Sequence, residues 1–443
     1  MSETAQQRPQ PRVLARAEHS ISRNSISESA LKVLYRLHRS GFIAYLVGGA
    51  VRDLLLERRP KDFDIGTNAR PQQVRQLFRN ARLIGRRFRL ARLVFGGEVV
   101  EVATFRRSPE PPEMEEGETV DVLAPIAEAE EYGTPEEDAW RRDFTINGMF
   151  YSIADFKVVD YVGGLADLDA GIVRSIGPAR LRFSEDPVRM MRAVEYAARL
   201  SFRLDDEAAE AISAMRGEIH RAAPARIAYE LGESLKGGQA LPIFDGLERA
   251  GLLRAILPTT VLPTVGTELL WGLLGGVDAA IASGATLRED TLFAVLLVPG
   301  FIRIARPGTA NPLAAGDLDA AVREYVDNAG VRLALSNHRG HILRSAFFCL
   351  ARLFSEPRST KLIVRTLRQD GFGVALELAR LLVSLTGRNA EALAQWEKAV
   401  ARLHAGLAPV EEAAPRSGDG ERRRRRRRRP RSHAARSGAG SAG

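Results

Sequence analysis

The sequence has a single cysteine, Cys349, among its 443 residues. One cysteine excludes an intramolecular disulfide framework and any zinc site built from several cysteines. Such sparing use of cysteine is typical of proteins from a reducing compartment. We therefore expect a cytoplasmic protein.

Long hydrophobic runs are absent as well. No stretch of about 20 apolar residues could form a membrane-spanning helix, and the N-terminal segment MSETAQQRPQPR lacks the apolar part of a secretory signal. Hydrophobic residues nevertheless make up 45% of the chain. A chain of this length exceeds what one core usually supports, so we expect two or more domains and no membrane partner.

Positive charge is concentrated near the C-terminus. The net charge is +9, but residues 411–443 hold eleven arginines against four acidic residues, which leaves +2 for the rest. Eight arginines are consecutive: Arg422, Arg423, Arg424, Arg425, Arg426, Arg427, Arg428 and Arg429. This composition cannot form a core, so we expect a disordered tail. The run is either simply solvated or binds phosphate groups without sequence preference.

Hydrophobic periodicity predicts an α+β fold. Helical and strand-like patterns alternate up to residue 183, which indicates a head with a mixed sheet, and nearly everything from 184 to 408 is helical. Residues 106–138 contain twelve acidic residues and little periodicity, so we expect a flexible loop there. The expected parts are a disordered arm (1–25), the head (26–183), a helical neck (184–260), a helical body (261–408) and a disordered tail (409–443).

Two aspartates in the predicted head have the spacing of a metal site. Asp62 and Asp64 lie two positions apart in a strand-like segment, so their side chains share one face while Phe63 points into the core. Glu101 stands alone in the apolar segment VVEVATF and could supply a third carboxylate from a neighbouring strand. An isolated Asp-x-Asp is weak evidence, and Glu101 could equally lie on an edge strand.

A double glycine precedes these aspartates. Gly48 and Gly49 separate a short apolar strand from a helical segment that carries Arg52. Bare backbone N–H groups at such a turn can approach a triphosphate, and the arginine adds positive charge. A plain strand-to-helix turn is the alternative interpretation, since glycine-rich turns are common.

Five motifs resemble one family when they are taken together. In order along the chain they are LVGGAVRDLLL, KDFDIGT, EVATFRR, RRDFTINGMFYS and EDPVRMMRAVEYAARL. This series resembles the bacterial class II nucleotidyltransferases, which comprise poly(A)-adding and CCA-adding enzymes. The resemblance covers roughly residues 20–260. It implies a polymerase-β-like head, followed by a helical neck and body, that extends RNA 3′ ends without a template.

The resemblance also implies roles for individual residues. Asp62 and Asp64 would hold two Mg²⁺ ions, with Glu101 as a further acidic partner and Asp143 as a member of the acidic active-site set. The residues expected at the nucleotide, which is ATP, are Gly48, Gly49, Arg52, Arg142 and Asn147, the last of which would stabilise its loop.

A further group is expected to read the base of the nucleotide. Asp186, Arg189 and Arg192 follow one another at intervals of three, which places them on one side of a helix near its start. A carboxylate can accept a hydrogen bond from the adenine amino group, and a guanidinium can donate to a ring acceptor. An exposed salt bridge between neighbouring turns is the alternative.

Two segments bear on the choice between the two branches of the family. Residues 83–91, LIGRRFRLA, resemble the poly(A)-adding branch. The N-terminal segment HSISRNSISESALKVLYRLHRSGF resembles it as well. Ala50 is at least as typical of the CCA-adding branch. We expect an enzyme that adds AMP from ATP to RNA 3′ ends and promotes RNA turnover, with RNA-decay proteins as partners. CCA addition to tRNA is the alternative, and a non-catalytic RNA-binding protein is an alternative of another class.

The arginine tail yields a first prediction. Deleting residues 416–443 should weaken RNA binding and shorten the added tails, because nonspecific contacts to phosphate groups would be lost. Addition of a single nucleotide should remain intact. The measurement is tail length on a generic RNA at physiological salt, and an unchanged length would contradict the prediction.

Overall fold

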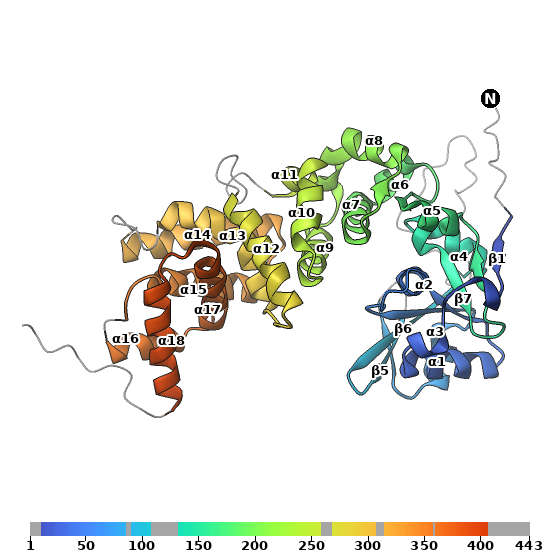
Figure 1. The fold of residues 1–443 in the computed structure, drawn as a ribbon, viewed down its shortest axis with the longest axis horizontal. Coiled ribbons are helices and arrows are strands. Elements are labelled where there is room, and N and C mark those ends of the chain that lie inside the picture. The colour runs from blue at the N-terminus through green and yellow to red at the C-terminus, as the bar shows by residue number, and fades with distance from the viewer. Residues whose placement is uncertain are drawn as a thin grey trace, which may run out of the picture.

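The computed structural model describes residues 10–85, 90–107, 132–257, 268–306, 314–357 and 359–405. The head and the helical body lie at the two ends of the molecule, and the neck helices join them (Figure 1). The predicted combination of a mixed-sheet head with a helical remainder is confirmed.

The head is built on an eight-stranded sheet. Its strands are β1 (Arg12–Leu14), β2 (Ala44–Val47), β3 (Phe63–Thr67), β4 (Ala81–Ile84), β5 (Leu90–Phe95), β6 (Glu98–Thr104), β7 (Met149–Ser152) and β8 (Val158–Asp160). They are ordered β1-β8-β7-β2-β3-β6-β5-β4. Only the β3–β6 pair of this sheet is parallel, and the other neighbours are antiparallel. The parallel pair lies inside the sheet, with Asp64 on β3 and Glu101 on β6.

The head also contains helices between its strands. They are α1 (Glu28–Arg39), α2 (Gly49–Leu55), α3 (Pro71–Leu77), α4 (Pro135–Arg141) and α5 (Gly164–Ala170). Helix α1 begins at Ser27, whose hydroxyl accepts a hydrogen bond from the Ala30 backbone N–H at 3.1 Å. Its buried face, which includes Val33 and Leu37, packs on the sheet as the periodicity predicts.

The expectation of a disordered arm over residues 1–25 is wrong for residues 10–25. Strand β1 pairs with β8, and Ile21 is buried with 1% of its surface exposed. The imidazole Nε2 of His19 lies 2.9 Å from the carbonyl oxygen of Phe156. One buried isoleucine and an added edge strand order this segment, although its composition is polar. Residues 1–9 of the expected arm lie outside the described residues.

The expected acidic loop also needs correction at its end. Helix α4 includes residues 135–138, and the side chain of Thr134 caps it through the Glu137 N–H at 3.2 Å. Thr134 and Glu137 form a reciprocal capping box, and the acidic residues of the first turn further stabilise the helix start because they interact favourably with the helix dipole. Residues 108–131 of this loop lie outside the described part of the chain.

The neck begins earlier than expected. Its helices are α6 (Ala179–Glu185), α7 (Val188–Leu200), α8 (Asp206–Met215), α9 (Pro224–Lys236), α10 (Ala240–Arg249) and α11 (Leu252–Ile256). The expected boundary at residue 184 therefore falls inside α6, which packs against α7 and α8. Strand β9 (Ile172–Val173), on the head side, pairs with β10 (Arg203–Leu204) of the neck and ties the two parts together.

The body is a bundle of helices around α13. Its helices are α12 (Glu268–Ala282), α13 (Glu289–Ala305), α14 (Ala315–Arg332), α15 (Asn337–Leu353), α16 (Thr360–Leu367), α17 (Phe372–Thr386) and α18 (Ala390–His404). Residues 291–301 of α13 are all buried, because α12, α14, α15 and α17 surround this helix. Helix α13 also contacts α9 of the neck.

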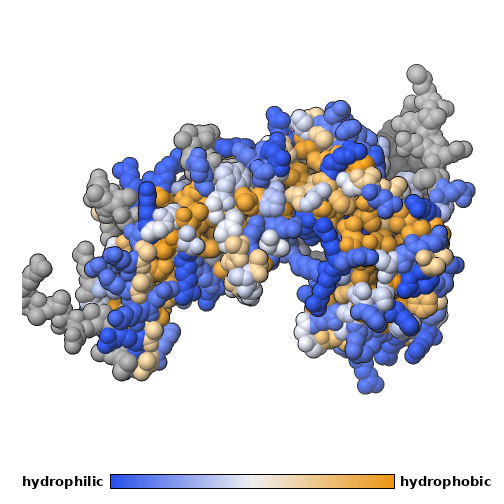
Figure 2. Space-filling model, viewed as in Figure 1, coloured by the Kyte–Doolittle hydropathy of each residue, from blue (hydrophilic) through white to orange (hydrophobic). Residues whose placement is uncertain are grey.

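Short 3-10 helices complete the described structure: Arg16–Glu18, Arg23–Ser25, Thr145–Asn147 and Arg216–Arg221. None of the described helices combines the length and apolar character needed to cross a lipid bilayer. In the space-filling view the molecule is hollowed between its two ends, below the neck (Figure 2).

The ordered arm gives a stability prediction. Replacing Ile21 by Ala should lower the free energy of unfolding by about 2–5 kcal/mol, because it leaves a cavity under the arm. Val13→Ala is the matched control, since Val13 lies in the same arm with 47% of its surface exposed. Chemical denaturation of both variants measures the difference, and equal losses would contradict burial of Ile21.

Candidate active site

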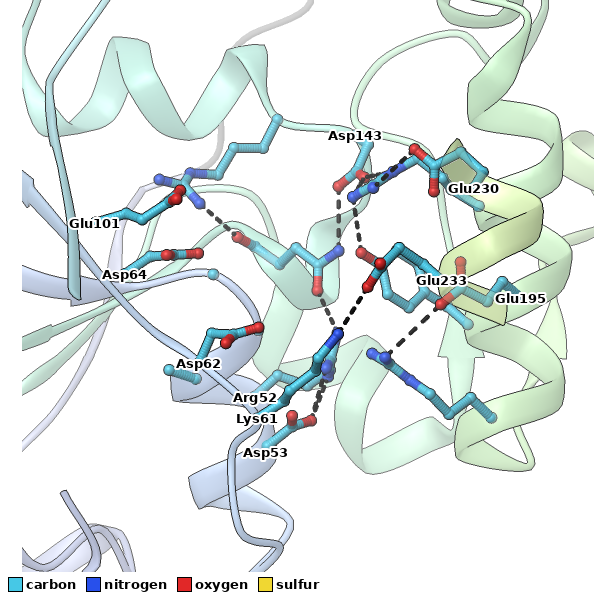
Figure 3. A pocket seen from close by; sticks show the side chains of 18 of the residues that line it. Arg52, Asp53, Lys61, Asp62, Asp64, Glu101, Asp143, Glu195, Glu230 and Glu233 are labelled. Atoms are coloured by element: carbon cyan, nitrogen blue, oxygen red, sulfur yellow. Dashed lines mark hydrogen bonds and ion pairs between the residues drawn. The ribbon is translucent and has the colours of Figure 1, made fainter. Parts of the chain in front are cut away.

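The predicted site residues meet in one pocket between the head and the neck. The cavity has a volume of about 710 Å³. Its lining includes all twelve residues that the sequence singled out within the described ranges: Gly48, Gly49, Arg52, Asp62, Asp64, Glu101, Arg142, Asp143, Asn147, Asp186, Arg189 and Arg192. Asp62, Asp64 and Glu101 lie on its head side, opposite Glu195, Glu230 and Glu233 from the neck helices (Figure 3). Residues far apart in sequence thus form a single site.

The parallel strands β3 and β6 position the carboxylates of the head. Asp64 and Glu101 are directly paired in the register of these strands. Asp62 immediately precedes β3, two positions before Asp64. Arg92 on β5 forms an ion pair with Glu101, with its Nε 3.9 Å from Oε1. Both of these side chains are well exposed, so this ion pair is weak.

Asp64 is held in an environment that disfavours its charge. Its pKa is raised from 3.8 to about 6, mainly by desolvation and further by the negative charges of Glu101 and Asp62, which outweigh the opposing effect of Arg142. The carboxylate remains accessible from the pocket, but protein surrounds much of it. A cation that binds beside such a carboxylate stabilises its charged form.

The chemistry of these carboxylates fits a magnesium ion. Mg²⁺ prefers oxygen ligands and is usually held by one or two carboxylates together with phosphate oxygens of a substrate. Asp62 and Asp64 are therefore the residues that could hold it, with Glu101 beside them. Within the described ranges, no three acidic, histidine or cysteine side chains form a ready-made metal cluster. The site would be completed by substrate oxygens.

The double glycine allows a close approach between backbone and arginines. Gly48 has φ of +68°, and a Cβ atom on it would lie 3.0 Å from Nη1 of Arg142. A Cβ on Gly49 would lie 3.3 Å from Nη2 of Arg52. At Gly48 the positive φ together with the lack of space favours glycine. Two guanidinium groups therefore lie close to the bare backbone at the start of α2.

Arg52 is buried and firmly held. Its Nη1 donates to Oδ1 of Asn147 at 2.7 Å, and Nε and Nη2 donate to Oδ1 of Asp53 at 2.8 and 2.7 Å. The side-chain amide of Asn147 in turn donates to Asp143 at 3.1 Å. Asn147 thus bridges the arginine of α2 and the aspartate that follows α4.

Asp143 has the opposite electrostatic environment to Asp64. Burial alone would raise its pKa, but the charge of Arg192 and hydrogen bonds from Asn147, Arg192 and the Phe144 N–H together lower it. Nε of Arg192 donates to Oδ2 at 2.9 Å. Arg192 also donates to the Tyr196 hydroxyl at 2.7 Å. Arg192 therefore lines the pocket mainly as the partner of Asp143.

Arg142 directly follows α4, and Asp138 of this helix orients its side chain. Its Nη2 donates to Oδ2 of Asp138 at 2.9 Å, and its guanidinium lies 5.2 Å from the centre of the Phe150 ring. The Asp138 pairing uses one edge of the guanidinium, while Nη1 faces the Gly48 turn. The arginine can thus offer a positive charge near the start of α2.

Asp186 and Arg189 line the pocket, but the expected helical arrangement of Asp186 is wrong. Asp186 has an extended backbone and precedes α7, because Pro187 follows it and disfavours a helical conformation there. Its carboxylate accepts from Nη1 and Nη2 of Arg226 at 2.7 and 2.9 Å. Arg189 donates instead to Glu185 at 2.9 Å. Asp186 and Arg189 therefore have different ion-pair partners, Arg226 for the first and Glu185 for the second.

Sequence reasoning missed several residues of the pocket wall. Those beyond the predicted set include Lys61 of the head and the neck residues Glu195, Tyr196, Arg199, Arg226, Tyr229, Glu230 and Glu233. A signal was present in α9, where polar residues recur every three or four positions on a helix that is otherwise apolar. Lys61 reaches this helix, since its Nζ donates to Glu233 at 2.7 Å.

Two other sequence predictions fall outside the described residues. The arginine run 422–429 lies there entirely, and so do residues 86–89 of the segment that favours the poly(A)-adding branch.

The environment of Asp64 yields a prediction about pH. Because its folded-state pKa lies above the ordinary value, ionisation destabilises the folded protein as the pH rises through about 6. Asp64→Asn should therefore raise the thermal midpoint at pH 7.5 without divalent cations, and the gain should disappear near pH 4. Asp169→Asn on the exposed side of α5 controls for loss of one charge. A gain that is equal at both pH values would contradict the prediction.

Two family models match the chain. The Poly A polymerase head domain matches residues 44–174, and residues 201–261 match a model described as the probable RNA and SrmB-binding site of polymerase A. The first covers most of the sheet that carries the carboxylates. The second covers α8 to α11 of the neck.

Two kinds of relative match the chain over different lengths. Poly(A) polymerase I of Salmonella typhi is 38% identical over 409 residues, which cover 89% of this chain and 87% of the relative. The CCA-adding enzyme of Bacillus subtilis is also 38% identical, but over 208 residues, which cover 47% of this chain and 50% of that enzyme.

A solved structure shares the fold. The CCA-adding enzyme of Bacillus stearothermophilus in complex with CTP matches 86% of this chain and 84% of its own, with a TM-score of 0.60 and 23% sequence identity. At this identity the match speaks for the fold alone. Together with the 38% identity to Salmonella typhi poly(A) polymerase I over most of both chains, these findings show that the chain belongs to the poly(A) polymerase family of nucleotidyltransferases.

Proposed function

We propose that the protein adds AMP residues from ATP to RNA 3′ ends without a template and thereby promotes RNA turnover. The observation that carries this proposal is the convergence of twelve predicted residues on one pocket between the head and the neck. One side of the pocket bears carboxylates suited to a cation, and the other walls bear arginines suited to a nucleotide, of which Arg52 is buried.

The acidic side would support the chemical step. Asp62 and Asp64 would hold two Mg²⁺ ions, with Glu101 beside them, and such ions neutralise the triphosphate and polarise the attacking hydroxyl. The reaction is in-line attack of the RNA 3′-hydroxyl on the α-phosphate of ATP, with pyrophosphate as the leaving group. The raised pKa of Asp64 supports this role, since the uncompensated carboxylate favours a bound cation.

The glycine turn and its arginines would bind the triphosphate. Arg52 and Arg142 both approach the backbone at Gly48 and Gly49, so they can donate hydrogen bonds to phosphate oxygens there. Arg52 is fixed by Asn147 and Asp53. Because these side chains are already oriented, little conformational entropy is lost when the nucleotide binds.

The neck would select the base. Asp186 can accept a hydrogen bond from the adenine amino group, and Arg189 can donate to a ring nitrogen. The bidentate contact with Arg226 orients the Asp186 carboxylate. The Val188 N–H also donates to Oδ1 at 3.3 Å, so Oδ2 is the oxygen that keeps a lone pair for a base. Asp143 and Arg192 would act mainly as positioning residues through Asn147 and Tyr196.

The extent of the sequence match favours poly(A) addition over CCA addition. The poly(A) polymerase I relative matches 89% of this chain, including the body, whereas the CCA-adding relative matches 47%. We further propose a cytoplasmic location and association with RNA-decay proteins, since an enzyme that tails RNA 3′ ends acts on substrates of RNA turnover. The arginines 422–429 would then retain RNA during repeated addition.

The activity is tested with purified full-length protein, Mg²⁺ and a generic oligo-RNA. With ATP as the sole nucleotide we expect long tails. Asp62→Asn should reduce incorporation at least a thousandfold with an unchanged thermal midpoint, because it removes a metal ligand that is exposed and supports no packing. Gel electrophoresis of the products measures tail length and rate.

Controls separate the alternatives. Asp169→Asn should polymerise like the wild type. A product that stops after CCA, formed from CTP and ATP on a tRNA that ends before CCA, would assign the chain to the other branch. Absence of any incorporation would favour a binding role alone, and wild-type activity of Asp62→Asn would refute the assigned site.

A further inference from the structure

The rim of the pocket carries an unusual aromatic side chain, Tyr229 of α9. It leaves 64% of its surface exposed, and no other phenylalanine, tyrosine or tryptophan in the described ranges is as exposed. A single exposed apolar residue is ordinary on a protein surface. This one lines the cavity that holds the candidate active site, which is where a ligand would meet it.

The ring of Tyr229 has no partner within the described part of the chain: no hydrogen bond, no ring contact and no cation above its face. Tyr196, on the inner wall, provides the contrast. The guanidinium carbons of Arg52 and Arg192 lie 5.2 and 5.3 Å from its centroid, and Phe144 packs edge-on at 5.7 Å. Other side chains therefore cover the ring of Tyr196, whereas the ring of Tyr229 has a face that is free to bind a ligand.

The position of Tyr229 links the two halves of the site. It lies three residues after Arg226, which holds Asp186, and four residues before Glu233, which accepts from Lys61 at 2.7 Å. Residues at these spacings share one face of a helix. Lys61 directly precedes Asp62. Tyr229 thus lies between the proposed base-selecting residues and the proposed metal ligands.

Exposure distinguishes an inner wall from an outer rim. The Arg52 side chain is 2% exposed, whereas that of Lys61 is 66% exposed. A nucleotide that reaches Arg52 fills the inner part of the pocket. The second substrate must then approach from the solvent side, where Tyr229 lies, to bring its 3′-hydroxyl to Asp62.

We propose that Tyr229 is the platform on which the 3′-terminal base of the RNA stacks. This inference rests on the proposed function and names a residue that binds the second substrate. Stacking suits a substrate of any sequence, because every base has an aromatic face. The glutamates near the ring are already paired, Glu230 with Arg192 and Glu233 with Lys61 and Lys236. The free aromatic face is therefore what this position offers to the RNA, and a base is the part of the RNA that stacks on it.

A graded series of substitutions tests the role of the ring. Tyr229→Phe should leave the KM for oligo-RNA unchanged, Tyr229→Leu should raise it moderately, and Tyr229→Ala should raise it about tenfold. The KM for ATP should stay constant in all three. Leu241→Ala, an exposed residue on α10 outside the pocket, is the control for loss of surface area. Thermal melts exclude loss of folding.

Direct binding provides a second measurement. An oligo-RNA ending in 2-aminopurine should lose fluorescence when it binds the Asp62→Asn protein, since stacking quenches this base. The quenching should disappear when Tyr229→Ala is added. Quenching that persists, or a rise in the KM for ATP in place of that for RNA, would overturn the proposal. The proposed function would still stand if the wild-type protein adds long tails and the Asp62→Asn variant adds none.

Discussion

The site depends on a chain of hydrogen bonds that runs from Arg52 through Asn147 and Asp143 to Arg192. Arg52 and Asp143 carry opposite charges that are both removed from bulk water, and each would be costly without a partner. Asp53 pairs with Arg52, and Arg192 pairs with Asp143. Asn147 links the two ion pairs by donating to Asp143 and accepting from Arg52. Arg192 extends the chain into α7, so the same contacts that neutralise buried charge also fix the neck against the head.

The pocket uses carboxylates in two distinct ways. Asp143 has a lowered pKa because hydrogen bonds and Arg192 outweigh its burial, and it is a fixed part of the framework. Asp64 has a pKa of about 6 because nearby carboxylates add to its desolvation. A compensated carboxylate organises the protein, whereas an uncompensated one stores unfavourable energy that a cation relieves. The sequence alone does not distinguish these two environments.

Local patterns predicted much of the head and of the site. The Gly48-Gly49 turn, the Asp62 and Asp64 spacing and the helix start at Ser27 depend on neighbours in sequence, so they could be read directly. The order of residues 10–25 could not, because it arises from the burial of Ile21 and from strand pairing with β8. The presence of Arg226 and Tyr229 in the pocket could not be predicted either, because it depends on how α9 packs beside the head.

The division of the pocket between the head and α9 has a consequence for biosynthesis. Its walls draw on residues from Gly48 to Glu233, so the site cannot be assembled from the head alone. During translation the N-terminal part emerges first and can begin to fold before the rest is made. A nascent chain that ends before α9 would already hold Asp62 and Asp64 but would lack one wall of the site. The pocket is therefore complete only after α9 of the neck has been synthesised.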